Sequence, residues 1–218
     1  MYKENPTSES LCLWCAEPLA HGQSVIHFLQ RRAVCIRCER KLCLEKKCLA
    51  IQNLKVHYFI VYNEQIEELL YRYKEQKDEA CGKLFFENHI GWIQRKFKGY
   101  KIIYLPSSKE KIEERGFHHL EVMCQRISIE KIHALSKKNK VLQKHQSKEN
   151  RANILKHFEI DVSMLKNTDN ILLVDDVCTT GGSLLAAHTL VLPHVAKVEA
   201  LVFTVSAHLI EPQRNKEQ

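Results

Sequence analysis

The sequence predicts an α/β protein whose sheet is largely parallel, preceded by a small metal-binding module. Three observations support this fold class: short apolar runs that alternate with helical periodicity, an apolar run that leads into two carboxylates and a Gly-rich turn, and two Cys-x-x-Cys pairs. With 218 residues, 44% of them hydrophobic, the chain can form one medium domain beside the small module. We expect the module to span residues 1–52 and the α/β domain to span residues 53–218.

Four apolar segments mark the expected strands. Tyr58 to Tyr62 is the first, and Ile102 to Leu105 is the second, halted by a proline. Ile171 to Val174 is apolar on both faces, which is typical of a buried parallel strand. Val198 to Val205 supplies a late strand.

Helical periodicity characterises the segment from Glu64 to Lys98, with a break near Asp78. One apolar face consists of Ile66, Leu69, Leu70 and Tyr73, and a second helix carries Leu84, Phe85, Ile90 and Ile93. A further helix is expected from about Ser183 to Leu192, between the last two strands. This order makes a βαβ unit, and such units have parallel strands.

The most informative stretch is ILLVDDVCTTGGSLL, from Ile171 to Leu185. Asp175 and Asp176 follow the expected strand, at the edge where open α/β sheets bind ligands. The turn from Thr179 to Ser183 supplies hydroxyl and N–H donors at a helix N-terminus, which favours a phosphate. Ribose hydroxyls can donate to two carboxylates, and Mg²⁺ bridging them to a diphosphate would offset the remaining charge. A simple helix N-cap explains one of the two carboxylates but not both.

Two Cys-x-x-Cys pairs, nineteen residues apart, predict a tetrahedral Zn²⁺ site. Redox chemistry is less favoured, because a single pair would suffice and a thioredoxin-like βαβ pattern is absent here. Since about fifty residues bury too little core to fold unaided, we expect the metal to supply folding free energy. Cys43 and Cys48 could substitute as ligands or be two spare thiols. The expected ligands are Cys12, Cys15, Cys35 and Cys38.

A second anion-binding turn is predicted after the strand that ends at Leu105. Pro106 to Lys109 offers backbone N–H groups and an ammonium, although Lys109 could equally be an ordinary solvated lysine. Arg115 precedes a glycine and could add a bidentate contact to an anion.

The segment VDDVCTTGGSL resembles the signature that binds phosphoribosyl diphosphate (PRPP) in type I phosphoribosyltransferases. The resemblance implies that Asp175 and Asp176 hold the ribose hydroxyls. It implies that the turn after Leu105 takes the diphosphate of PRPP, with Arg115 adding a contact. The residues expected to contact PRPP around these turns are Ser107, Ser108, Lys109, Cys178, Thr179, Thr180, Gly181, Gly182 and Ser183. No catalytic residue is assigned.

Together with the cysteine pairs and LPSSKEKIEERGF, this signature resembles the ComF (ComFC-like) family of competence proteins over nearly the whole chain. The resemblance implies a zinc motif joined to a phosphoribosyltransferase-like domain. It also implies a role in natural transformation, on the cytoplasmic side, as single-stranded DNA enters. Two departures stand out: His118-His119 replaces a common Asn-Gln, and Lys144 to Asn153 looks like a shortened Gln…Arg…Asn element.

Positive charge is concentrated in residues 101–156, which contain 13 Lys/Arg and 6 Asp/Glu. This surplus favours weak, salt-sensitive binding of single-stranded DNA, although a solvated face with a diphosphate site would also explain it. The odd cysteine number and the lack of a secretory pattern at the N-terminus predict a cytoplasmic protein. No apolar run approaches the ~18–20 residues that cross a bilayer, so contact with the inner membrane or its DNA-uptake machinery would be peripheral.

Three functions remain open from the sequence. The chain could be an enzyme that transfers ribose 5-phosphate from PRPP, a PRPP-binding sensor or scaffold in competence, or a zinc-dependent nucleic-acid-binding protein with a vestigial pocket. The intact acidic pair favours PRPP binding, with a competence role and with catalysis left open. The acceptor, the protein partners and the oligomeric state are not determined by these patterns.

Overall fold

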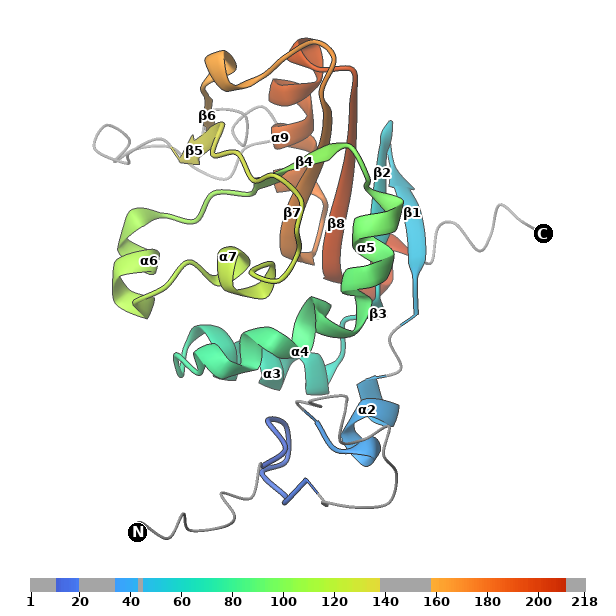
Figure 1. Ribbon diagram of the computed structural model, residues 1–218, viewed down its shortest axis with the longest axis vertical. Coiled ribbons are helices and arrows are strands. Elements are labelled where there is room, and N and C mark those ends of the chain that lie inside the picture. Colours follow the sequence, from blue (N-terminus) through green and yellow to red (C-terminus); the bar gives the residue numbers. More distant parts are fainter. Residues whose placement is uncertain (1–10, 20–33, 43–44, 138–157, 211–218) are drawn as a thin grey trace, which may run out of the picture.

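The computed structural model describes residues 11–19, 34–42, 45–137 and 158–210. Its main sheet has the strand order β1-β2-β8-β7-β4, with β3 beside β8 (Figure 1). Strands β2, β8, β7 and β4 are parallel, and β1 is antiparallel to β2, so the predicted α/β class with a mainly parallel sheet is confirmed. The strands are β1 (Lys47–Ile51), β2 (Leu54–Tyr58), β3 (Ile60–Val61), β4 (Tyr100–Tyr104), β7 (Asn170–Cys178) and β8 (Lys197–Val205). A small antiparallel pair consists of β5 (Leu135–Lys137) and β6 (Phe158–Ile160).

The helices cover both faces of the main sheet. They are α2 (Ile36–Leu42), α3 (Glu64–Lys74), α4 (Lys83–Phe86), α5 (Ile90–Lys96), α6 (Lys109–Arg115), α7 (His119–Met123) and α9 (Gly182–Val191). Short 3-10 turns follow α3 and separate α4 from α5, namely η1 (Glu79–Gly82) and η2 (Glu87–His89), and others are η4 (Val162–Met164), η5 (Leu192–His194) and η6 (Ala207–Leu209). The predicted helical segment is therefore helical but broken more often than its periodicity indicates.

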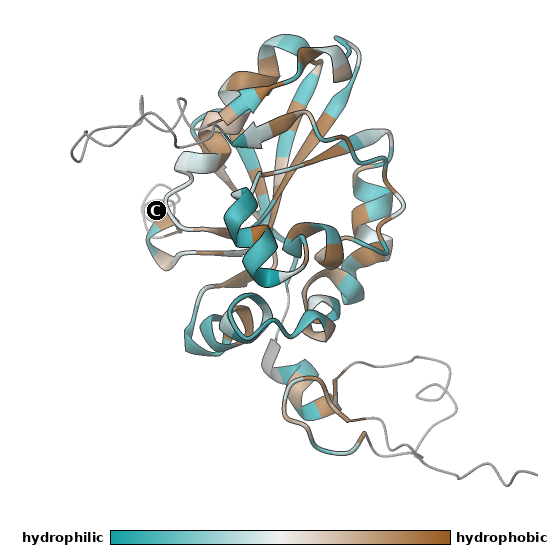
Figure 2. Ribbon diagram, turned by 90° about the vertical axis from the view of Figure 1, so that its left-hand side faces the viewer, coloured by the Kyte–Doolittle hydropathy of each residue, from teal (hydrophilic) through white to brown (hydrophobic). Residues whose placement is uncertain are grey.

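Two apolar cores form because successive strand residues point to opposite faces of the sheet. On one face Leu172 and Phe203 pack with the buried residues of α3, α4, α5 and α7. On the other face Leu173 and Val202 pack with the buried residues of α9. Figure 2 shows the hydrophobic residues along the middle of the strands and hydrophilic residues on the outer helices.

Strand β7 extends four residues beyond the predicted apolar run. It pairs with β8 as far as Cys178, so Asp175 and Asp176 lie inside the strand rather than after it. Its pairing with β4 stops at Val174, where the Leu105 N–H donates to the Val174 carbonyl. From Asp175 onward no described strand lies on one side of β7, and this opening becomes the site.

The cysteine segment lies against α3 at one end of the molecule (Figure 1). Cys12 and Cys38 belong to the same buried cluster as the apolar face of α3, and the Arg72 guanidinium of α3 donates to the Trp14 carbonyl at 3.1 Å. Strand β1, which begins at Lys47, pairs with the main sheet. The predicted domain boundary after residue 52 stays a prediction.

Candidate functional site

A cavity of about 270 Å³ opens where β4 and β7 end. Its walls come from α3, the loop after β4, α6, α7, β5, β6, β7 and α9, so that segments distant in sequence meet there. The lining residues are Lys74, Glu75, Leu105, Pro106, Ser107, Lys111, Arg115, His119, Lys137, Phe158, Asp175, Asp176 and Ser183.

The two predicted carboxylates are held by the backbone of their own strand. Asp175 Oδ1 accepts the Asp176 N–H at 3.0 Å, and Asp176 Oδ1 accepts the Val177 N–H at 2.9 Å. Asp176 is buried, and its Oδ2 forms an ion pair with the Lys74 ammonium. His119 Nε2 lies 3.7 Å from the same oxygen. One oxygen of each carboxylate is thus anchored, while Asp176 Oδ2 faces the cation at the end of α3.

Burial shifts the protonation of the cavity groups. It raises the pKa of Asp175 to about 7, against the opposing effect of Lys74 and Lys137. It lowers the pKa of Lys74 to about 8, although the Asp175 carboxylate opposes the shift. Burial, together with nearby Lys74 and Arg115, lowers the pKa of His119 to about 2, so its imidazole is neutral at physiological pH. Such shifts are typical of functional sites.

Arg115 connects the cavity to the end of α3. Its Nε donates to the carbonyl of Lys74 at 3.2 Å, which satisfies one unpaired carbonyl at the C-terminus of that helix. The side chain is buried, and its Nη1 has no hydrogen-bond partner among the described residues. A buried guanidinium N–H without an acceptor costs free energy unless an anion from solution binds it.

The turn before α9 has the conformation that the glycines predict. Gly181 has φ +77°, and a Cβ there would lie 2.7 Å from Cδ1 of Ile51, so both the backbone and the space favour glycine. The Leu185 N–H donates to the Gly181 carbonyl and begins the helix. Ser183, in the first turn of α9, reaches the cavity wall. The first turn of a helix leaves N–H groups free for an anion.

The structure brings five predicted site residues together: Ser107, Arg115, Asp175, Asp176 and Ser183 all line the cavity. The other predicted residues do not line it. Ser108 instead caps α6 by accepting the Lys111 N–H at 3.4 Å, Lys109 is exposed, and Cys178 is buried. The remaining residues of the turn are Thr179, Thr180, Gly181 and Gly182. The binding roles of all these residues stay predictions.

Five further polar residues of the cavity were not predicted: Lys74, Glu75, Lys111, His119 and Lys137. Lys74 ends a helix predicted only for its apolar face, and nothing in its neighbourhood in the sequence signals a site. His119 had one signal, since His118-His119 departs from the Asn-Gln common in the resembled family. Their roles depend on how α3 and α7 pack against the end of β7.

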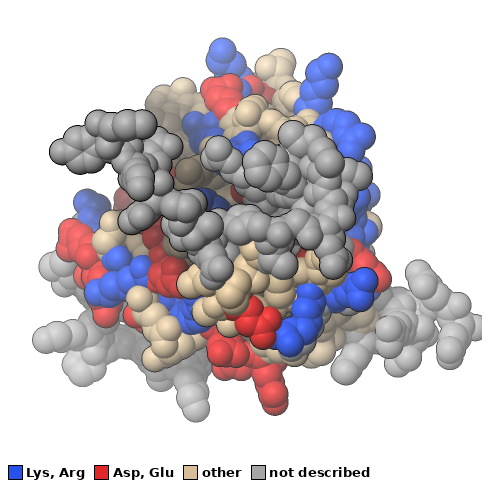
Figure 3. Space-filling view, turned by 60° about the horizontal axis from the view of Figure 1, so that its bottom comes forward, with Lys and Arg blue, Asp and Glu red and all other residues tan. Residues whose placement is uncertain are grey.

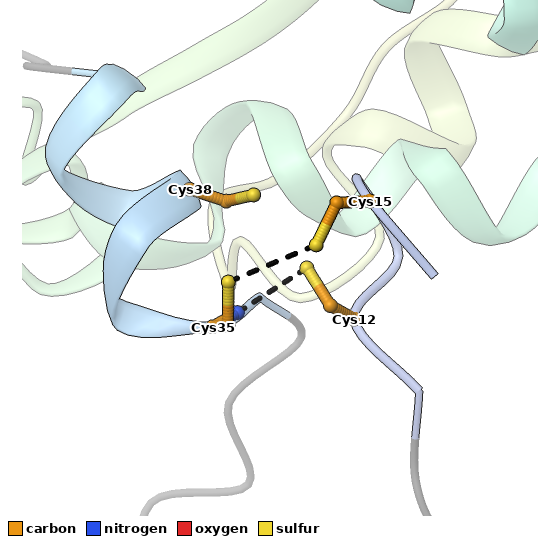
Figure 4. A group of neighbouring side chains, drawn as sticks. All are labelled: Cys12, Cys15, Cys35 and Cys38. Carbon is orange, nitrogen blue, oxygen red and sulfur yellow. Dashed lines mark hydrogen bonds between the residues drawn. The ribbon is translucent and has the colours of Figure 1, made fainter. Parts of the chain in front are cut away.

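The four predicted cysteines form a second cluster, in which the sulfur atoms point toward one another (Figure 4). Cys15 Sγ lies 3.9 Å from Cys35 Sγ. Tetrahedral zinc, with Zn–S bonds of about 2.3 Å, separates its sulfur ligands by about 3.8 Å, so the cluster fits the ion. The Cys35 N–H donates to Cys12 Sγ at 3.3 Å. Burial opposes ionisation of Cys12, but backbone hydrogen bonds from Cys15 and Cys35 outweigh it and lower the pKa to about 7. The cluster can therefore hold zinc; Cys48 is exposed and Cys43 lies outside the described residues.

Part of the predicted DNA-binding surface also lies outside the described residues, including Lys144 to Asn153. On the face shown in Figure 3, the described Lys/Arg and Asp/Glu side chains are interspersed. Among the described helices, none has the length and apolar character needed to cross a membrane.

The fold and the two clusters define an α/β protein with a polar cavity at the sheet's carboxyl edge and a tetrathiol site before the sheet. Among solved structures, the chain is similar to adenine phosphoribosyltransferase from Saccharomyces cerevisiae, with a TM-score of 0.40, 17% identity, and coverage of 81% of this chain and 92% of the other. It is similar to the enzyme from Giardia lamblia, with a TM-score of 0.44, 17% identity, and coverage of 79% and 87%.

Curated proteins give a more particular match. The chain is 29% identical over 181 residues to competence protein ComFC of Bacillus subtilis, covering 80% of this chain and 68% of that protein. It is 26% identical over 123 residues to ComFC of Streptococcus pneumoniae, covering 56% of this chain and 55% of that protein. No family model matches the chain. These relatives confirm the resemblance to the ComFC-like competence proteins that the sequence predicts.

Proposed function

We propose that this chain is a PRPP-binding, phosphoribosyltransferase-like protein that acts in natural competence. In this role it supports the uptake of single-stranded transforming DNA on the cytoplasmic side of the inner membrane. Two relatives named as competence proteins support the biological role. The cavity at the end of β7 supports the ligand.

The observation that carries the proposal is that one cavity contains both carboxylate acceptors and cationic donors. Asp175 and Asp176 offer acceptors for the two ribose hydroxyls. Arg115, whose buried Nη1 lacks a partner among the described residues, offers a donor for an anion, and Lys111 and Lys74 add positive charge nearby. A ligand that carries both a diol and phosphate groups satisfies both sets, and PRPP is such a ligand.

Catalysis is the alternative form of the same proposal. In an active enzyme the bond from the ribose anomeric carbon to diphosphate breaks, and a nitrogen of an acceptor base forms the new bond to that carbon. The two carboxylates would stabilise positive charge that develops on the sugar ring, and Mg²⁺ bound with PRPP would neutralise the leaving diphosphate. The described cavity holds no group that we assign to the acceptor, so the proposal rests on PRPP binding.

The test is calorimetric titration of PRPP with Mg²⁺ into the full-length, zinc-loaded protein. We expect the Asp175→Asn/Asp176→Asn double variant to lose PRPP binding, because amides replace the anionic acceptors. Asp161→Asn is the matched control, since Asp161 is exposed and its amide can still accept the Ser163 N–H. Unchanged affinity in a folded double variant would contradict the site assignment. If the wild type binds no PRPP, the cavity is vestigial. If it binds PRPP, release of diphosphate in the presence of candidate bases would distinguish an enzyme from a binding protein.

Zinc is proposed as the structural metal of the cysteine cluster. The Cys12→Ser/Cys35→Ser double variant should lose one equivalent of zinc and become sensitive to proteolysis before residue 45, because metal binding supplies the folding free energy of so small a module. Cys48→Ser is the control, since Cys48 is exposed and apart from the cluster. Zinc content by atomic emission and a melting curve are the measurements. A normal melting curve with no bound metal would show that the cluster is not a metal site.

Single-stranded DNA is the proposed macromolecular partner, through the basic residues of 101–156. The charge surplus of that segment favours this partner over a neutral surface. Binding of a labelled oligonucleotide should weaken steeply between about 50 and 200 mM salt, as expected for phosphate neutralisation. Absent or salt-independent binding would remove DNA from the proposal and leave a protein of the uptake machinery as the partner.

A further inference from the structure

An imidazole faces the two carboxylates inside the cavity. His119 Nε2 lies 3.7 Å from Asp176 Oδ2, and the ligand atoms of His119, Asp175 and Asp176 all lie within 4.8 Å of one another. Metal–ligand bonds of about 2.0–2.2 Å place adjacent ligand atoms roughly 3 Å apart and opposite ones roughly 4 Å apart. Small side-chain movements would bring these three groups around one ion.

The ring of His119 is held from its other nitrogen. Nδ1 lies 3.4 Å from Ser107 Oγ in the loop after β4. The Tyr73 hydroxyl of α3 donates to the His119 carbonyl at 2.6 Å, which fixes the residue at the start of α7. When Nδ1 carries the proton and donates a hydrogen bond to Ser107 Oγ, the lone pair of Nε2 points toward Asp176. This arrangement resembles metal-binding histidines, in which a partner on one nitrogen orients the other toward the ion.

Asp176 supplies an independent observation. The residue is 4% exposed, and apart from its ion pair with Lys74, its Oδ2 accepts no hydrogen bond from the described part of the chain. Oδ2 and the imidazole nitrogen therefore face each other as two acceptors at 3.7 Å, too far apart for a hydrogen bond. A cation between them would satisfy both.

We propose that His119, Asp175 and Asp176 bind a divalent first-row transition metal ion directly, and that the Lys74 ammonium is the counter-ion that the metal displaces. The site uses the cavity of the proposed function but requires no PRPP, which separates it from Mg²⁺ carried in with the substrate. One imidazole and two carboxylates suit first-row transition metal ions better than Mg²⁺, which prefers oxygen ligands and retains its water. Among these ions Mn²⁺ binds the weakest, so it is the most stringent probe of the site. The open side of the cavity leaves coordination positions for oxygen atoms of a ligand.

The Lys74 side chain has space to move away from Asp176 when the ion binds. It is the last residue of α3, its side chain is 24% exposed, and it shares the cavity wall with Lys111 and Arg115. Displaced from Asp176, the ammonium stays in a cluster of three cations that suits a phosphate group. Metal binding at the carboxylates would thus free a cation for the anionic part of a ligand.

Mn²⁺ alone is the probe, titrated into the full-length, zinc-loaded protein without PRPP. The thiolate cluster is already filled and prefers zinc, so Mn²⁺ reports on the second site. Free Mn²⁺ is measured by its electron paramagnetic resonance signal, and we expect one equivalent to bind. His119→Gln removes a direct ligand. It should weaken this binding by at least about tenfold, which is the smallest loss expected even for a residue that only orients a ligand. His133→Gln is the matched control, because His133 is exposed and does not line the cavity.

Lys74→Met gives a result that misfolding cannot imitate, since removing the competing ammonium should strengthen Mn²⁺ binding. No bound Mn²⁺ in the wild type, equal affinity in His119→Gln and wild type, or weaker binding in Lys74→Met would each overturn the proposal. The proposed function fails in a different way. Mn²⁺ binding without PRPP binding would support the metal site and contradict the PRPP assignment. PRPP binding with Mg²⁺ but without a Mn²⁺ site would support the PRPP assignment and contradict the metal site.

Discussion

Both ends of the main sheet bury charged side chains, but the two ends differ in how completely these side chains are hydrogen-bonded. Near the amino ends of β4 and β8, Glu199 is 5% exposed and its carboxylate is hydrogen-bonded by Tyr100 at 3.0 Å and by His57 at 2.6 Å, with Lys197 also at 2.6 Å. At the carboxyl end, Asp176 is equally buried. Among the described residues, however, its Oδ2 has only the Lys74 ion pair, and Arg115 Nη1 has no hydrogen-bond partner.

This difference separates a structural charge from a functional one. A buried carboxylate whose partners are complete stabilises one arrangement of the chain, and removing a partner is costly. A buried group whose partners are incomplete costs free energy in the free protein, which a ligand can recover. Burial alone does not distinguish the two ends, whereas the count of satisfied hydrogen bonds does.

The largest expected effect comes from matched amide substitutions at the two ends. Glu199→Gln should lower the free energy of unfolding by about 3 kcal/mol, because hydrogen bonds from Lys197, His57 and Tyr100 outweigh burial and lower the pKa of Glu199 from 4.5 to about 2. Asp176→Asn should cost much less, since its partners are incomplete. Urea unfolding measures both losses of unfolding free energy, provided that the denaturant slope (m-value) of each variant equals that of the wild type. Equal losses would contradict the distinction between the ends.

The amino end should also make the protein sensitive to acid. The folded-state pKa of Glu199 is lowered, so its contribution is complete above about pH 4.5 and is lost as the pH falls toward about 2. Burial lowers the pKa of His57 as well, which removes further stability below about pH 6.5, where the unfolded chain takes up a proton. Urea midpoints measured from pH 7 to pH 3 should therefore fall, and Glu199→Gln should flatten the decline below pH 4.5. An equally steep decline in that variant would assign the sensitivity to other groups.

The smallest expected effect compares two cations near the carboxyl end. Arg115→Met should weaken PRPP binding by about tenfold, or 1.4 kcal/mol, because it removes a buried donor that lacks a partner in the free protein. Lys109→Met should change the affinity less than about twofold, because Lys109 is exposed and does not line the cavity. Calorimetry on both variants is the measurement. A larger loss for Lys109→Met would restore the turn after Leu105 as the main diphosphate contact.

Much of the fold follows from periodicity. The apolar face of α3 and the cores of β4, β7 and β8 lie within the predicted segments, because alternation and helical spacing report directly on burial. The β1-β2 hairpin was not predicted, although Leu54, Val56 and Tyr58 alternate with polar residues as in a half-buried strand; the expected strand began only at Tyr58. The extension of β7 through Asp175 depends on pairing with β8, a long-range contact that the residues of β7 do not encode.

The sequence by itself determined the elements whose chemistry is local: the two Cys-x-x-Cys pairs, the acidic pair that directly follows an apolar run, and the glycine turn before α9. Neighbouring residues share a loop or strand end whatever the rest of the chain does, so their spacing is sufficient. Only the tertiary structure decided that Lys74 and His119 meet Asp176. That meeting requires α3 and α7 to pack together through the Tyr73 hydroxyl and the His119 carbonyl, so that both helices reach the open edge of β7.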